Sequence, residues 1–185
     1  MALKLIFMGT PSFAVPILKS INNSKHEILA VYTNPPKKSR RGQRLNESSV
    51  HQISKQLKLK VRHPEKLDDE EELKFLKKIN PDLVVVVAYG KIIPKNMLNL
   101  KNIKFINIHA SLLPKWRGAA PIQRSIIAMD GETGISIMKI VPQLDAGPFM
   151  LQKKIIIKND DNYTSLSIKL SKLGSEAILE ALHLI

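Results

Sequence analysis

The sequence predicts an α/β fold: a doubly wound, mainly parallel sheet with helices on both faces. Short apolar segments typical of strands alternate with longer amphipathic segments typical of helices, which is the pattern of successive β-α-β units. The segment 82–88, Asp-Leu-Val-Val-Val-Val-Ala, is almost continuously apolar, as expected for a strand covered on both sides. The chain has 185 residues, 44% of them hydrophobic and 24% charged, which suits one domain with a full core.

Each element follows from the spacing of apolar residues along the chain. We expect strands at 3–8, 27–33, 57–61, 82–88, 103–109, 134–141 and 149–157. We expect helices at 13–22, 48–57, 68–79, 119–129 and 163–184. Asn162 or Asp161 can cap the last helix, whose apolar stripe comprises Leu166, Leu170, Leu173 and Ala177. Because this helix stops on an apolar Leu-His-Leu-Ile, we expect the natural protein to continue into another domain.

The apolar N-terminus is interpreted as a buried first strand, not as a targeting segment. Gly9, Pro11 and Pro16 interrupt the apolar run, and no small-residue cleavage site follows it. The run is also too short to cross a bilayer as a helix. The absence of cysteine excludes disulfides and thiol chemistry and fits a reducing compartment. We therefore expect a cytoplasmic monomer with no membrane partner.

The chain is strongly basic, with 29 Lys and Arg against 16 Asp and Glu and a net charge of +13. Such an excess favours an anionic partner such as nucleic acid, a nucleotide or a membrane surface, although scattered lysines also occur on ordinary surfaces. One cluster stands out, comprising Lys37, Lys38, Arg40, Arg41 and Arg44. It is either a solvated surface loop or a set of contacts to RNA phosphates.

In a doubly wound sheet, ligands bind outside the carboxyl ends of the strands. The unusual loops of this sequence each follow an expected strand, and they occupy 8–12, 33–49, 88–94, 109–121 and 142–148. We therefore expect all five loops at one edge of the sheet, around a common site.

Polar side chains converge at this edge. Asn107 and His109 are two residues apart on an expected strand, so they share one face, while Ile106 and Ile108 share the other. Asp145 lies in a turn-rich loop after a later strand. Together they can perform acyl transfer: the amide donates to an oxyanion, the imidazole moves a proton at neutral pH, and the carboxylate orients the imidazole or accepts a proton.

The sequence also limits the chemistry. It has no cysteine and no Gly-x-Ser-x-Gly turn, so the nucleophile is expected to be the substrate itself. Its five histidines show no His-x-x-x-His pair, so we expect no metal. Each polar residue has an ordinary alternative: Asn107 can satisfy backbone groups, His109 can be a hydrogen-bonded edge residue, and Asp145 can simply form a turn.

Several motifs resemble the folate-dependent formyltransferases. They are Asn-Ile-His-Ala-Ser-Leu-Leu-Pro-Lys-Trp-Arg-Gly-Ala-Ala-Pro at 107–121, Leu-Asp-Ala-Gly-Pro at 144–148, and the segments 8–18 and 84–94. The similarity covers essentially the whole chain. It implies that 10-formyltetrahydrofolate donates a formyl group to the amino group of methionine on initiator tRNA. The neutral amine would attack the formyl carbon directly, with no acyl-enzyme.

The same resemblance implies roles for particular residues. The catalytic residues would be Asn107, His109 and Asp145. The folate site would comprise Ser111, Leu112, Leu113 and Pro114, with backbone contacts from Gly90, Lys91, Ile92 and Ile93. The tRNA would be bound by Lys37, Lys38, Arg40, Arg41 and Arg44, in a basic loop at 34–49. Residues 1–185 would be the catalytic domain, and the family's C-terminal β-barrel domain would lie outside this chain.

Other acceptors remain open at the level of sequence. Glycinamide ribonucleotide and sugar-nucleotide formyltransferases share the Asn-x-His and Asp pattern, although the basic insertion and the segment 115–123 resemble them less. An alternative of another class is a noncatalytic RNA-binding module that kept the fold. The intact set of Asn107, His109 and Asp145 argues against that alternative.

Overall fold

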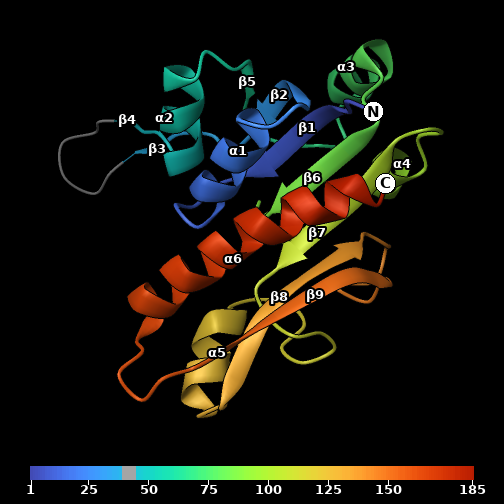
Figure 1. Ribbon diagram of the computed structural model, residues 1–185. Coiled ribbons are helices and arrows are strands. Elements are labelled where there is room, and N and C mark those ends of the chain that lie inside the picture. The colour runs from blue at the N-terminus through green and yellow to red at the C-terminus, as the bar shows by residue number, and fades with distance from the viewer. Residues whose placement is uncertain (39–44) are drawn as a thin grey trace.

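A seven-stranded sheet with helices on both faces forms the body of the protein (Figure 1). This computed structural model describes residues 1–38 and 45–185. The strands lie in the order β5 (Val61–Arg62), β2 (Glu27–Tyr32), β1 (Lys4–Gly9), β6 (Leu83–Val87), β7 (Lys104–His109), β8 (Glu132–Lys139) and β9 (Phe149–Ile156). The pairs from β5 to β7 are parallel, whereas β8 and β9 are antiparallel to their neighbours. The predicted doubly wound, mainly parallel sheet is confirmed.

Helices cover the two faces of the sheet unequally. The helices are α1 (Ala14–Asn22), α2 (Ser49–Gln56), α3 (Glu70–Ile79), α4 (Lys95–Leu98), α5 (Pro121–Ile127) and α6 (Tyr163–His183). The long α6 packs beside α1 across one face, as Figure 1 shows in red and blue. The other face has a smaller core with α3 and α4, which leaves room there for loops.

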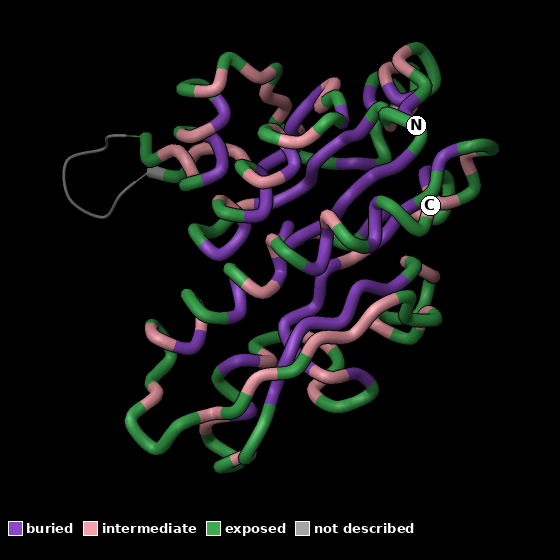
Figure 2. The backbone as a smooth tube through the Cα atoms, viewed as in Figure 1, coloured by how far each residue is buried: buried purple, intermediate pink, exposed green. Residues whose placement is uncertain are grey.

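Strict alternation along the central strands supplies both cores. On β6, Leu83, Val85 and Val87 join the core under α1 and α6, while Val84 and Val86 join the core under α3 and α4. All five are buried, and the central strands form the buried interior in Figure 2. Burying each such side chain contributes about 1.5–3 kcal/mol. The apolar run at 82–88 is therefore the centre of the fold.

Several boundaries differ from the prediction. The expected strand at 57–61 is reduced to β5, because Leu57 still closes α2 and Lys58 takes a left-handed conformation with φ of +56°. The short α4 and a separate antiparallel pair, β3 (Lys37–Lys38) with β4 (Leu45–Asn46), were not predicted. Elements this short give too little apolar periodicity to be recognised.

The last of the five loops lines the common cavity but reaches it by a different route from the others. Because β8 is antiparallel, Lys139 pairs with Ile106, so β8 ends beside the middle of β7. The loop 140–148 then folds back, and the amide of Lys139 donates to the carbonyl of Pro148 at 2.9 Å. A Cβ at Gly147 would clash with the Lys139 carbonyl oxygen, so glycine is required for this close approach.

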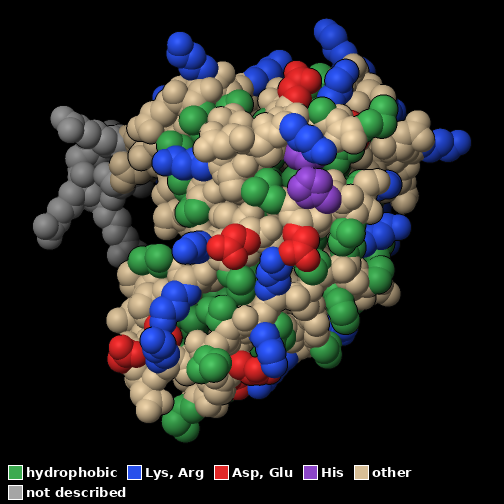
Figure 3. All heavy atoms as spheres, in the orientation of Figure 1, with side chains coloured by type: hydrophobic (Ala, Val, Ile, Leu, Met, Phe, Trp, Pro, Cys, Tyr) green, Lys and Arg blue, Asp and Glu red, His purple; other side chains and the backbone are tan. Residues whose placement is uncertain are grey.

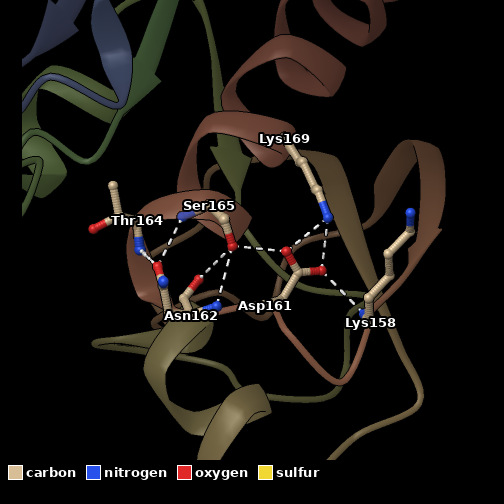
Figure 4. Close-up of polar contacts among 6 residues, drawn as sticks. All are labelled: Lys158, Asp161, Asn162, Thr164, Ser165 and Lys169. Atoms are coloured by element: carbon tan, nitrogen blue, oxygen red, sulfur yellow. Dashed lines mark hydrogen bonds and ion pairs between the residues drawn. The ribbon is translucent and has the colours of Figure 1, made fainter.

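The start of α6 is held by a compact polar network (Figure 4). Asn162 is the N-cap: its side chain accepts from the amides of Thr164 and Ser165, and Ser165 Oγ accepts from the Asn162 amide. Asp161 accepts from Lys169, Ser165 and the amide of Lys158, and only 2% of its side chain is exposed. These hydrogen bonds, led by that of Lys169, hold the pKa of the Asp161 carboxyl well below its usual range.

Replacing Asp161 with Asn should lower the melting temperature by a few degrees at pH 7 and by clearly less at about pH 2.5. A carboxyl whose pKa is depressed by folding stabilises the protein above its unfolded pKa of about 3.9, and that contribution is lost as the pH falls toward the folded value. Thermal unfolding of the parent and of Asp161→Asn, measured from pH 7 down to about pH 2.5, gives the difference in melting temperature at each pH. A gap that is independent of pH would contradict this assignment.

Candidate active site

A cavity of about 610 Å³ lies at the carboxyl ends of β1, β6 and β7. It occupies the switch point of the sheet, where β1 has β2 on one side and β6 on the other, the usual place for a ligand in such folds. Its walls come from the loops after β1 and β6, from the end of β7, from residues 118–123 and from the loop 140–145. The volume is in the range of small-molecule sites.

Asn107, His109 and Asp145 meet in this cavity. Asp145 Oδ1 accepts a hydrogen bond from Asn107 Nδ2 at 3.2 Å, and Asp145 Oδ2 lies 3.5 Å from His109 Nδ1. The amide of Gly118 also donates to Asp145 Oδ2 at 2.8 Å. The side chains of His109 and Asp145 are only 7% and 10% exposed. The structure thus brings together the three residues predicted from sequence, and their catalytic role stays a prediction.

Hydrogen bonding determines where His109 carries a proton. Nε2 lies 2.8 Å from the carbonyl oxygen of Trp116, and a carbonyl can only accept, so Nε2 must be protonated. In the neutral ring Nδ1 then has a lone pair facing the Asp145 carboxylate. A second proton on Nδ1 would instead be attracted to Asp145. The ring therefore donates at Nε2 to the loop and turns Nδ1 toward the Asp145 carboxylate.

Four non-glycine residues with left-handed backbone lie in the cavity wall or, in the case of Trp116, behind it against His109. They are Ala88, Trp116, Ala120 and Asp145, with φ between +45° and +58°. Each such conformation costs roughly 1–2 kcal/mol, and such residues tend to cluster at functional sites. At Asp145 the turn directs the carboxylate toward β7.

The residues predicted to contact folate through their backbone do line the cavity. Gly90, Lys91, Ile92 and Ile93 form one wall. Lys91 Nζ donates to the carbonyls of Pro64 and Glu65 at 2.6 and 2.7 Å, so its ammonium group fastens the wall to a neighbouring loop. Ile92 is 84% exposed at this wall and offers an apolar surface to a ligand.

The other residues predicted to contact folate do not lie in the cavity wall. They are Ser111, Leu112, Leu113 and Pro114. None of the four lines the main cavity, and only Leu113 and Pro114 line a smaller hollow of about 400 Å³ beside Asp145. Ser111 is fully buried: its Oγ donates to the carbonyl of Lys115, and its own carbonyl accepts from Ser136 Oγ. Ser111 therefore shapes the turn leading to Trp116 and is not placed to contact a ligand in the cavity.

The basic cluster is only partly within the described residues. Lys37 pairs with Asn46, and Lys38 with Leu45, in the β3–β4 pair. Arg40, Arg41 and Arg44 lie outside the described residues. Elsewhere, Lys and Arg side chains are spread over the face drawn in Figure 3, among acidic and apolar side chains. That face does not show the chain's positive charge as one patch.

Some residues of the site were not foreseen. Phe13, Gln123 and Tyr163 line the cavity, and backbone groups of Trp116 and Gly118 hold His109 and Asp145. Backbone contacts leave no signal in residue types. Tyr163 follows the cap of α6, and the packing of α6 on the sheet, which sequence periodicity does not give, brings it to the cavity.

Within residues 1–38 and 45–185, no three His, Asp or Glu residues come together as ligands for a metal ion. Nor does any helix there combine the length and the apolar character needed to cross a membrane.

The chain is similar to known formyltransferases in sequence and in fold. The curated methionyl-tRNA formyltransferase of Pelagibacter ubique is 56% identical over 181 residues, or 97% of this chain and 58% of that protein. That of Wolbachia sp. subsp. Drosophila simulans is 48% identical over 98% of this chain and 60% of that protein. The solved phosphoribosylglycinamide formyltransferase from Anaplasma phagocytophilum has a TM-score of 0.80 at 22% identity, covering 98% of this chain and 86% of its own, so it supports the fold alone.

The chain thus spans less than two thirds of the length of the curated relatives it matches. A family model described as formyl transferase matches residues 3–182, which is nearly the whole sequence. By that match, the chain belongs to the formyl transferase family.

Proposed function

We propose that this chain transfers a formyl group from 10-formyltetrahydrofolate to the amino group of methionyl initiator tRNA, for translation initiation. The observation that carries the proposal is the contact of Asp145 with both Asn107 and His109 in a cavity of ligand size. The names of the relatives at 56% and 48% identity support the same reaction and acceptor.

The donor fits the cavity by size and by chemistry. Folate is flat, with a polar edge, and such a ring suits a mostly apolar slot with backbone donors and acceptors. The wall at Gly90–Ile93 offers both an apolar surface and backbone groups, and Leu144, 68% exposed, adds a further apolar side chain to the lining. The reacting formyl group would lie beside Asn107 and His109.

The step is a direct transfer between two nitrogen atoms. The methionyl amine attacks the formyl carbon, its C–N bond forms, and the carbonyl oxygen becomes an oxyanion. The side-chain amide of Asn107 donates one hydrogen to Asp145, and its second hydrogen can be donated to the oxyanion. Protonated His109 supplies a positive charge beside the same oxygen. Asp145 takes the amine proton, directly or through water. The oxyanion then collapses to reform the C=O bond, the C–N10 bond breaks, and N10 of the folate leaves with one proton, which balances the proton lost by the amine.

The acceptor is assigned to RNA on different grounds. The basic loop at 34–49 begins beside the cavity, since Asn34 Nδ2 donates to the carbonyl of Tyr89 in the cavity wall at 3.0 Å. Lysine and arginine in that loop would neutralise tRNA phosphates. We also propose that the family's β-barrel domain adds tRNA affinity in the longer protein, and that the protein acts as a cytoplasmic monomer.

A formyl-transfer assay with three acceptors tests the proposal. Purified protein and 10-formyltetrahydrofolate are offered charged initiator tRNA, glycinamide ribonucleotide and an amino sugar nucleotide. We expect formylation of the tRNA alone, because only the tRNA presents a methionyl amine and a phosphate backbone. The inactive control is His109→Ala, which should bind folate but transfer nothing.

The other outcomes of this assay are informative. Transfer to either small acceptor would keep the mechanism and overturn the assignment to tRNA. No transfer to any acceptor would call for the same assay with the remaining C-terminal region of the Pelagibacter ubique relative joined to this chain. Continued absence of transfer there, with folate still bound, would leave an RNA-binding module as the better description.

Replacing Arg40, Arg41 and Arg44 with Ala should weaken tRNA binding and flatten its salt dependence by about one unit of slope per lost phosphate contact. Donor binding should not change. The matched control removes the same charge at Lys74, Lys77 and Lys78 on the exposed side of α3. Equal losses of tRNA affinity in the two triple variants would show that the loop acts only through the net charge of the protein.

A further inference from the structure

The His109 ring is held by Trp116, a residue that does not line the cavity. Nε2 donates to the carbonyl of Trp116, and neither Trp116 nor Asp130 lines the cavity. Trp116 has a left-handed backbone, with φ of +58°, a conformation that a bulky residue adopts only when its surroundings impose it. Two residues later, the amide of Gly118 holds Asp145. The loop 115–118 therefore sets the positions of both His109 and Asp145.

The surroundings that impose this conformation centre on Asp130. The indole Nε1 of Trp116 donates to Asp130 Oδ2 at 2.7 Å, and Lys115 Nζ donates to Oδ1 at 2.6 Å. The Asp130 side chain is only 9% exposed. Burial alone would raise the pKa of the Asp130 carboxyl, but the hydrogen bonds of Lys115 and Trp116 outweigh it and lower that pKa. Asp130 thus keeps its charge and both of its donors.

Asp130 is also fixed from behind. Its backbone amide donates to the carbonyl of Ser125 at 3.0 Å, just beyond the end of α5. On the other side of Trp116, the hydroxyl of buried Ser111 donates to the carbonyl of Lys115. The indole is therefore attached to a helix end and the preceding residue to the buried turn, so the Trp116 carbonyl has little freedom to leave His109.

We infer that Asp130 is a positioning residue for formyl transfer, acting through the indole and the carbonyl of Trp116 on His109. It fixes the proton on Nε2 and leaves Nδ1 facing Asp145 and the reacting atoms. The inference rests on the proposed function for its kinetic consequence, but its structural claim concerns the resting protein. Misplacing a catalytic group by about 1 Å can cost about 10²-fold in rate.

The experiment uses two variants with different risks. Asp130→Asn removes the charge, and Trp116→Phe removes only the indole donor while keeping an aromatic ring. Long-range ¹H–¹⁵N spectra of protein with labelled histidine read which ring nitrogen of His109 carries the proton, and His109→Gln assigns its signals. We expect the parent to be protonated at Nε2. Both variants should lose this single state and show kcat lowered tenfold or more, with KM for the folate donor unchanged.

The matched control is Glu132→Gln. Glu132 lies two residues after Asp130 and forms an exposed ion pair with Lys154, so this change removes the same charge without touching Trp116. It should leave the His109 signals and kcat at parent values. A parent-like His109 spectrum in either test variant would overturn the inference, even where the melting temperature falls. Because the spectra need no substrate, they decide the inference even if the parent transfers no formyl group.

Discussion

The rest of the site depends on the hydrogen bonds and the ion pair of the Asp145 carboxylate. This carboxylate joins its own hairpin loop to the end of β7, through Asn107 and His109, and to the loop after β7, through Gly118. Neither the strand nor the loop alone would place an acid, an amide and an imidazole together. The antiparallel β8 makes the contact possible, because its loop folds back over the face to which Asn107 points.

The fold surrounds this region with loops and with the first residues of α5 and α6, without weakening the core. The α1 and α6 face carries the larger apolar core, while the opposite face carries a smaller core limited to α3 and α4. Over β7 and β8 that second face is covered mainly by loops, in which Trp116, Ala120 and Asp145 have left-handed backbone. Roughly 1–2 kcal/mol of strain at each such residue is small beside the burial of the central strands.

The fold could be predicted from the sequence more fully than the site. The sheet, its main helices and the shared face of Asn107 and His109 follow from hydrophobic periodicity, because that periodicity decides which side chains leave water. The direction of β8 does not, since apolar alternation is the same in parallel and antiparallel strands. The burial of Ser111 was missed for a related reason: a serine in a turn looks alike whether its hydroxyl bonds to backbone or to a ligand. Trp116 acts through a carbonyl, which every residue possesses.

The most direct test of this account is single-turnover formyl transfer by Asp145→Asn, with donor binding measured on the same protein. The amide keeps the size of the side chain but loses the charge that faces His109 and the group that accepts the amine proton. We expect the transfer rate to fall by a factor of at least about 10², while the affinity for the folate donor stays within a factor of a few of the parent value. Transfer at the parent rate would contradict it, because the site would then work without the carboxylate that organises it.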